Sequence, residues 1–244
     1  MIKVQDVAYA VGGIDVIKGV SFSTKKNEFI SIIGPSGCGK STLLRMMIGL
    51  VSPTSGRVLF MNREITAPRK EISFVFQDFG LLPWLTNIEN VKIGLSYFEI
   101  SDEEKDRTAK DLLARFGLEG FEDSYPNVLS GGMRQRVGIA RAIASEPLVL
   151  LMDEPFSSLD ELTANTLRSD ILSMVRNTAI PVNSVIMVTH NVEEAVELSN
   201  KIVILSGKPT SVKEVMEVDM DYPRNRRSRK FQGMVDHVYR ILTG

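Results

Sequence analysis

The stretch "IIGPSGCGKSTLL", residues 32–44, decides the fold of this chain. The β-branched and aromatic run "FISIIG", residues 29–34, leads into it and predicts a buried strand. The run "KSTLLRMMIGL", residues 40–50, follows with apolar side chains at helical spacing and predicts a helix. The glycine-rich piece therefore joins a strand to a helix. Ordering so many glycines costs backbone entropy, which a bound ligand can offset.

The glycine pattern of this junction matches a phosphate-binding loop. Gly34 is followed by four residues and then by Gly39, Lys40 and Ser41. Glycines let the backbone wrap a phosphate without Cβ clashes, so that N–H groups and the positive end of the helix dipole point at the anion. Lys40 is then expected to reach the β- and γ-phosphates, and the Ser41 hydroxyl to ligate Mg²⁺. A coincidental turn is the alternative, which the flanking strand and helix disfavour.

Composition narrows the class of protein. The chain has 244 residues, of which 43% are hydrophobic and 24% charged, as is usual for soluble globular proteins. Its net charge of −1 predicts no nucleic-acid partner and no general affinity for anionic membranes. Cys38 is the only cysteine, so no internal disulfide is expected and a reducing compartment is compatible. The pattern predicts neither a secretory signal nor a membrane span.

A second apolar run, "PLVLLMDEP" at residues 147–155, ends in two adjacent carboxylates. It predicts a buried parallel strand. Asp153, at the carboxyl end, is expected to approach Mg²⁺, as the second acidic element of phosphate-loop NTPases does. Glu154 points differently and could activate an attacking water. The alternative is a strand end with a solvated acidic turn.

The segment "VLSGGMRQRVGIARAIASEP", residues 128–147, predicts a helix that opens on Ser130, Gly131 and Gly132. Ser130 is a natural N-cap, and the two glycines leave the helix terminus bare. This is a second candidate anion site at a helix N-terminus. The local pattern alone does not separate it from an ordinary capped helix.

Two further strands end in polar residues. "EISFVFQDFGLLPW", residues 71–84, predicts a strand that ends at Gln77, whose amide could ligate a metal, although a surface glutamine is the usual case. "SVIMVTH", residues 184–190, predicts a strand that ends at His190, which could hydrogen-bond a terminal phosphate. A single histidine at a strand end is otherwise weak support for a site.

Together these pieces resemble the ATP-binding cassette family of transporter ATPases over about residues 1–205, and "LSGG" at residues 129–132 is the most specific match. The resemblance implies ATP and Mg²⁺ as cofactors, with Ser41, Gln77 and Asp153 at the metal and Glu154 as the catalytic base. It makes His190 a switch residue and Lys40 a catalytic one. The residues that it implies for nucleotide binding are Gly34, Pro35, Ser36, Gly37, Cys38, Gly39, Lys40, Ser41, Thr42, Gln77, Tyr9, Val11, Ser130, Gly131, Gly132 and Met133.

The resemblance also explains two anion sites in one chain. In the family, two subunits pair head to tail, and the signature of one closes over the ATP held by the other. The loop "SSLD", residues 157–160, is then expected at the dimer contact. A membrane permease is expected to dock near Gln77 and Trp84, with a solute-binding protein in the full system, so the chain would lie peripherally on the cytoplasmic face of the membrane. Plain subdomain core is the alternative for Trp84.

Two positions depart from the family pattern. Met133 replaces the usual glutamine of the signature, which removes an amide that could bond the ribose while leaving the backbone donors. Where the family usually stacks an aromatic side chain on adenine, this chain has Val11. Tyr9 lies two residues earlier, on the same face of an extended strand, so either side chain could contact the base.

Within the family, "GLLPW" at residues 80–84 resembles the importer ATPases for nitrate, aliphatic sulfonates and taurine, to which importers of pyrimidine vitamin precursors are related. An ATPase of another transporter class is the first alternative. A soluble cassette ATPase acting on DNA or ribosomes is disfavoured because the chain has one cassette and no sustained heptads. A module that only binds nucleotide is disfavoured by the complete set of Lys40, Asp153, Glu154 and His190.

The predicted fold class is α/β: a phosphate-loop NTPase core with an N-terminal antiparallel β region and an inserted α-helical subdomain at about residues 81–146. The cassette is expected to span residues 1–205, and residues 206–244 to form a short C-terminal tail. The tail contains "RNRRSRK", residues 224–230. A solvated basic patch is the favoured interpretation of that run, and contact with lipid headgroups or an acidic partner is the alternative.

Overall fold

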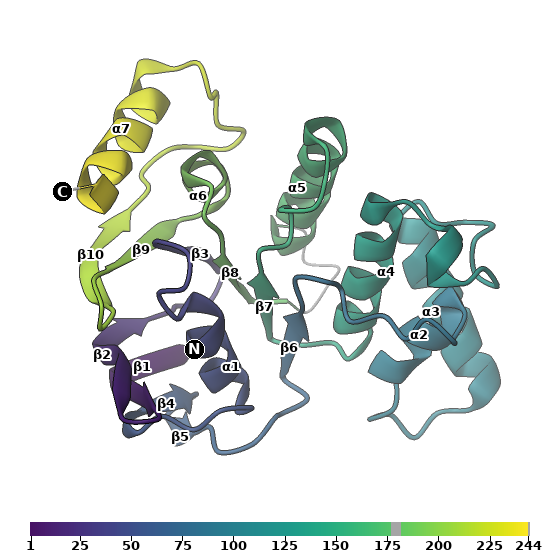
Figure 1. Ribbon diagram of the computed structural model, residues 1–244. Helices are drawn as coiled ribbons and strands as arrows, with labels where there is room; N and C mark the ends of the chain where they lie inside the picture. Colours follow the sequence, from purple (N-terminus) through teal and green to yellow (C-terminus); the bar gives the residue numbers. More distant parts are fainter. Residues whose placement is uncertain (177–181, 244) are drawn as a thin grey trace. The chain divides into compact units, whose positions relative to one another are not determined.

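The computed structural model describes residues 1–176 and 182–243 (Figure 1). The chain divides into two compact units. Unit 1 comprises Met1–Arg69 and Ser184–Gly244, and unit 2 comprises Lys70–Asn183. Among the described residues, no helix combines the length and the apolar character needed to cross a lipid bilayer.

Unit 1 contains an antiparallel sheet with the strand order β2-β1-β4-β5. Its strands are β1 (Ile2–Val11), β2 (Ile14–Ser23), β4 (Ser55–Phe60) and β5 (Arg63–Glu64). At the start of β1, Ile2 and Val4 are buried while Lys3 and Gln5 are exposed, because successive side chains of a strand point to opposite faces. Gly12 and Gly13 join β1 to β2 with positive φ angles of 57° and 80°, which suit a two-residue hairpin turn. The predicted N-terminal antiparallel region is confirmed.

A parallel-rich sheet runs through unit 1 in the order β10-β9-β3-β8. Its strands are β3 (Glu28–Ile33), β8 (Ser184–Val188), β9 (Lys201–Ser206) and β10 (Ser211–Glu217). β3 pairs in parallel with both β8 and β9, and β10 pairs antiparallel with β9. Every residue of β3 and β8 is buried, as is typical of parallel strands covered on both faces. The α/β class is therefore confirmed.

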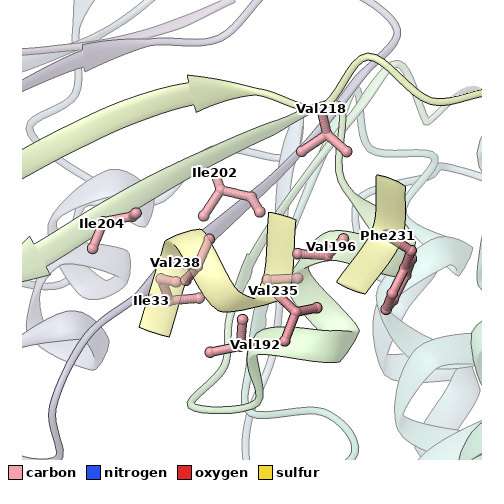
Figure 2. Packing of buried hydrophobic residues seen from close by; sticks show 10 residues of the cluster. Ile33, Val192, Val196, Ile202, Ile204, Val218, Phe231, Val235 and Val238 are labelled. Atoms are coloured by element: carbon pink, nitrogen blue, oxygen red, sulfur yellow. The ribbon is translucent and has the colours of Figure 1, made fainter. Parts of the chain in front are cut away.

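The helices of unit 1 are α1 (Lys40–Ile48), α6 (Val192–Leu198) and α7 (Arg229–Thr243). α7 buries Phe231, Val235 and Val238, which recur at the spacing of one helix face. Figure 2 shows these side chains together with Val192 and Val196 of α6. The cluster they join contains Ile33, Val192, Ala195, Val196, Ile202, Ile204 and Val218. Residues beyond position 205 therefore pack on the sheet of unit 1 through both β10 and α7.

The basic run at residues 224–230 differs from the solvated patch that the sequence predicts. Arg224 is only 8% exposed, and its guanidinium donates to the carbonyls of Val196 and Ser199, each at 2.6 Å. Burial lowers the pKa of Arg224, and its guanidinium also lies over the Tyr222 ring. Arg226 forms an ion pair with Glu197 at 2.6 Å. For Arg224 and Arg226 the solvated interpretation is wrong, because both side chains attach the tail to α6.

Unit 2 contains the parallel pair β6 (Ile72–Val75) and β7 (Val149–Asp153). Its helices are α2 (Asn87–Gly94), α3 (Asp102–Arg115), the 3₁₀ turn η1 (Pro126–Val128), α4 (Gly131–Ala144) and α5 (Glu161–Arg176) (Figure 1). α2 packs against both α3 and α4. A Cβ added at Gly94 would collide with the carbonyl of Arg141, so the absence of a side chain there lets α2 approach α4 closely.

Candidate functional site

The glycine-rich loop of unit 1 connects β3 to α1, as the sequence predicts. Gly37 and Gly39 have φ angles of 74° and 92°, which only glycine adopts without strain. A Cβ added at Gly34 would lie 2.7 Å from the carbonyl oxygen of Leu205 in β9. The fold therefore requires glycine at these positions. Between them, Pro35 and Ser36 are exposed, whereas Cys38 is buried and 2% exposed.

Lys40 and the start of α1 form a cradle suited to a phosphate. Lys40 is 5% exposed, and its Nζ donates to the carbonyls of Gly34 and Pro35, each at 2.9 Å. Its ammonium group is thus turned back over the loop. Gly39 precedes α1 and has no side chain that could cap it, so the first N–H groups of the helix have no side-chain cap acceptor. An anion is the natural partner for such a terminus. Ser41 and Thr42 follow in the first turn, both half-buried.

The β1–β2 hairpin carries Tyr9 and Val11, the two candidate contacts to adenine, and it packs on the glycine-rich loop within unit 1. A Cβ added at Gly39 would lie 3.1 Å from Ile17 Cγ1 and 3.2 Å from Val16 Cγ1, both in β2. In β1, Tyr9 pairs with Ile17 and is half-buried, whereas Val11 is 54% exposed at the turn. Both candidates therefore lie on the strand beside β2.

His190 lies at the same edge of the sheet as the phosphate loop. β3 and β8 are parallel neighbours, and the N–H of Thr189 donates to the carbonyl of Ile32 at 3.2 Å. Both chains therefore leave the sheet at their carboxyl ends, where ligands of open α/β sheets bind. The prediction that the strand ends at His190 is wrong by two residues, because β8 ends at Val188.

The residues around His190 are fixed by hydrogen bonds. The hydroxyl of the buried Thr189 donates to Glu194 Oε2 at 2.7 Å and accepts from the N–H of Asn191 at 3.0 Å. The Asn191 side chain in turn accepts from the N–H groups of Glu193 and Glu194 and caps α6. The exposed His190 is thus held between two residues of defined conformation.

In unit 2, the two carboxylates stand at the end of β7. Asp153 is the last residue of the strand and is 5% exposed. Glu154 follows with a φ of 47°, a left-handed conformation that is strained for a residue with a side chain. The carbonyl of Glu154 accepts from the N–H of Ser157 at 3.2 Å and from its hydroxyl at 3.0 Å. Strain of this kind gathers at functional sites and persists only where the surroundings hold it.

Gln77 also lies in unit 2, in the turn after β6. The strand ends at Val75, so the prediction of a strand ending at Gln77 is wrong by two residues. β6 runs parallel to β7, with Val75 opposite Met152. Gln77 therefore leaves the pair at the same edge as Asp153.

The signature forms the N-terminus of α4. Ser130 is the N-cap, and its Oγ accepts from the N–H of Met133 at 3.3 Å. A Cβ added at Gly132 would collide with Thr163 of α5, whereas one at Gly131 would make only ordinary contacts. Met133 contributes its backbone N–H to the cap, and the side chain that replaces the family glutamine leaves that bond intact.

The "SSLD" loop meets the signature within unit 2. The closest atoms to a Cβ added at Gly131 belong to Leu159 and Ser158, at 3.7 and 3.8 Å. Asp160 accepts from the hydroxyl of Thr163 at 2.6 Å and from its N–H at 3.0 Å. These bonds lower the pKa of Asp160 and fix the start of α5.

Asn90 is a structural residue that the sequence analysis missed. It is fully buried in α2, and its side chain bonds the N–H of Leu82 and the carbonyls of Leu82, Leu85 and Thr86. An asparagine among the apolar residues of a helix was the available signal. In the loop that Asn90 holds, Trp84 is 69% exposed, so the subdomain-core interpretation of Trp84 is wrong.

Comparison with known proteins identifies the family of this chain. The family model described as "ABC transporter" matches residues 17–157. The chain belongs to the ABC transporter family. It is therefore an ATP-binding and ATP-hydrolysing cassette, as the resemblance predicted, and Mg²⁺ is the metal that such cassettes use.

Relatives of this ABC cassette extend over nearly the whole chain. It is 43% identical over 229 residues to an uncharacterised ABC transporter ATP-binding protein of Methanocaldococcus jannaschii, covering 94% of this chain and 85% of the relative. It is 42% identical over 221 residues to the aliphatic sulfonates import ATP-binding protein SsuB of Bacillus thuringiensis subsp. konkukian, covering 91% and 86%. A dimeric ATP-binding cassette in a post-hydrolysis state, bound to ADP and Pi, is 34% identical with a TM-score of 0.79, covering 91% of this chain and all of that one.

Proposed function

We propose that this ABC cassette works as a head-to-tail homodimer that powers the import of a small solute through a membrane permease. The observation that carries the proposal is the presence in one chain of two differently built helix N-termini, the uncapped α1 and the Ser130-capped α4. One ATP needs only one phosphate cradle. A second glycine-lined terminus is accounted for if it faces the ATP held by another copy.

The phosphate-loop residues would bind the triphosphate of ATP. The N–H groups of the loop and of the first turn of α1 donate to phosphate oxygens, and Lys40 exchanges the carbonyls of Gly34 and Pro35 for the phosphates. Ser41, Gln77 and Asp153 supply oxygen atoms of the kind that Mg²⁺ prefers, and the bound ion neutralises charge that develops on the phosphates. Tyr9 or Val11 packs on the base.

Glu154 is the proposed general base. Its carboxylate orients a water for in-line attack on the γ-phosphate and accepts its proton, while the left-handed backbone fixes its direction. His190 donates a hydrogen bond to the γ-phosphate. From the second copy, Ser130 and the backbone of Gly131, Gly132 and Met133 stabilise the charge that develops on the phosphoryl group.

The import assignment rests on the relatives and on one surface residue. SsuB, 42% identical, is named for the import of aliphatic sulfonates, and we propose this class of solute ahead of nitrate, taurine and pyrimidine vitamin precursors. Trp84, 69% exposed in the loop after Gln77, supplies an apolar contact for a permease helix. A solute-binding protein completes the system, and the cassette lies peripherally on the cytoplasmic face of the membrane.

The dimer and the role of Glu154 are tested together in purified protein. Glu154→Gln keeps the size of the side chain but removes its basicity, so phosphate release should stop while ATP and Mg²⁺ trap a dimer, measured by light scattering. Glu119→Gln, an exposed glutamate of the same unit, is the control and should hydrolyse ATP normally. A Glu154→Gln protein that stays monomeric with ATP contradicts the head-to-tail dimer. Unchanged phosphate release contradicts the role of Glu154.

Import is tested in the cell that makes this protein. Lys40→Ala should abolish uptake of one member of a panel of alkanesulfonates, taurine, nitrate and pyrimidine vitamin precursors. Loss of alkanesulfonate uptake supports the proposed solute class, and loss of another member corrects it. If uptake of every member is unchanged, the assignment to this group of importers is wrong.

A further inference from the structure

Arg141, in the last turn of α4, binds the loop that follows Gln77. Its Nη2 donates to the carbonyl of Phe79 at 2.6 Å, and its Nη1 donates to the carbonyl of Gly80 at 2.7 Å. The two acceptors are consecutive along the chain. A planar guanidinium can hold two such oxygens at once, which a lysine ammonium does not do with the same geometry.

The loop held by Arg141 is conformationally strained. Phe79 has a φ of 65° and Gly80 a φ of 56°, so a residue with a bulky side chain stands in the left-handed region. Such a conformation persists only where its surroundings hold it. The bonds from Arg141 to both carbonyls help to keep Phe79 and Gly80 in this conformation.

α4 supplies a second contact one turn earlier. Gly138 lies against Phe79, since a Cβ added there would be 3.3 Å from Phe79 Cβ and 3.4 Å from its carbonyl oxygen. Residues three apart share one face of a helix, so Gly138 and Arg141 contact the same loop from the same side. Phe79 is itself buried, with 6% of its surface exposed.

The guanidinium of Arg141 is partly buried, and its backbone is fixed in place. Burial lowers the pKa of Arg141, and the nearby Asp78 carboxylate acts in the opposite direction. The backbone of Arg141 is also held in place, because Gly94 of α2 packs directly on its carbonyl. A partly desolvated cation on a fixed backbone makes strong, directional bonds to the loop.

We infer that Arg141 is a positioning residue for Gln77, and that it ties the Gln77 loop to the helix that begins with the signature. The inference rests on the proposed function, in which Gln77 contributes an oxygen to Mg²⁺. Arg141 is not one of the residues that we propose to contact nucleotide or Mg²⁺. It acts by fixing the two residues that follow Asp78, and Ser130 lies at the start of the same helix.

The test measures the Mg²⁺ concentration that gives half-maximal ATPase activity, in the full-length protein. Arg141→Lys keeps the charge but loses the paired bonds, and should raise this concentration about tenfold, as loss of an outer-sphere partner does. Gln77→Ala should raise it as well. In the double variant, Arg141→Lys should add nothing to Gln77→Ala, because both changes act through one interaction.

Two further variants separate positioning from stability. Arg107→Lys alters an exposed arginine of α3 in the same unit and should leave the Mg²⁺ dependence unchanged. Gly138→Ala presses on Phe79 without touching Arg141, and should shift the Mg²⁺ dependence in the same direction by a smaller factor. It therefore provides the measurement if Arg141→Lys does not fold.

The outcomes are distinct. A lower melting temperature with an unchanged Mg²⁺ dependence, or effects of Arg141→Lys and Gln77→Ala that add fully, would show that Arg141 is only structural and would overturn the inference. If Gln77→Ala itself leaves the Mg²⁺ dependence unchanged, the proposed metal role of Gln77 fails, and the inference that Arg141 acts through it fails with it.

Discussion

The N-termini of α1 and α4 are both glycine-rich, yet they are built in opposite ways. α1 follows Gly39, has no side-chain cap, and starts with a lysine whose ammonium bonds the carbonyls of its own loop. α4 follows Ser130, whose hydroxyl caps the helix by accepting from the N–H of Met133. The first terminus belongs to unit 1 and the second to unit 2.

The difference suggests distinct roles for the two anion sites that we propose. A helix start that lacks a cap leaves donors that gain most from a ligand. A helix start with its own cap has one of these donors already satisfied, and it offers a hydroxyl and glycine backbone to a ligand. We therefore expect the α1 terminus to gain stability from bound nucleotide, and the signature to keep the same conformation with or without it.

The largest effect is expected from the lysine that only α1 possesses. Lys40→Ala removes the buried ammonium group from the phosphate cradle and should lower the rate of ATP hydrolysis on the order of 10²–10³-fold. Phosphate release measures it. Lys26→Ala, at an exposed lysine of the same unit, is the matched control and should keep the normal rate. Equal losses in the two variants would contradict the special role of Lys40.

Nucleotide should stabilise the two helix starts unequally. At an ATP concentration about 100 times its Kd, with Mg²⁺ present, the free energy of unfolding should rise by about 2.7 kcal/mol, and EDTA should reduce the gain. Hydrogen exchange in dilute, monomeric protein should slow at residues 37–44 and stay unchanged at residues 131–134. Equal protection of both segments in the monomer would show that the signature is not preformed.

Adding one methyl group at each helix start should destabilise the protein at the α1 start and not at the α4 start. Gly39→Ala forces a side chain into a left-handed conformation beside Ile17 and Val16, and should cost about 1–3 kcal/mol of stability and weaken ATP binding. Gly131→Ala meets only ordinary contacts and should change stability by less than about 0.5 kcal/mol. Thermal unfolding and nucleotide titration measure both. A destabilised Gly131→Ala variant would contradict the geometry described for α4.

The smallest effect concerns the cap itself. Ser130→Ala should cost about 1 kcal/mol or less, because the lost bond is exposed and 3.3 Å long. Ser101→Ala removes a similar cap from α3, where Ser101 accepts from the N–H of Glu104 at 3.2 Å, and should cost about the same. Only Ser130→Ala should also slow ATP hydrolysis. If both variants hydrolyse ATP at the normal rate, the hydroxyl of Ser130 serves its own helix alone.

The parts of the site that depend on local chemistry were predictable from the sequence. A glycine that must sit against a neighbouring strand, as Gly34 does at Leu205, has no substitute, so its spacing from Lys40 is a reliable signal. The same holds for Asp153, which follows an apolar run and ends β7. In both cases the residues themselves carry the constraint.

The parts that depend on distant partners were not predictable. The strands before Gln77 and His190 end two residues early: their last ladder pairs are Val75 with Met152 and Val188 with Ile32. Arg224 looked solvated within its basic run, yet its guanidinium donates to the carbonyls of Val196 and Ser199, more than 20 residues earlier. Contacts of this range leave no mark on the local sequence.

Trp84 is the only tryptophan of the chain and is largely exposed, at 69%. The protein therefore carries a natural fluorophore at one point of its surface, and its indole emission reports the polarity of that point alone. A membrane helix seated there would move the emission to shorter wavelengths and shield the indole from soluble quenchers. If the proposed permease docks at Trp84, unlabelled protein would report the assembly of the complex optically.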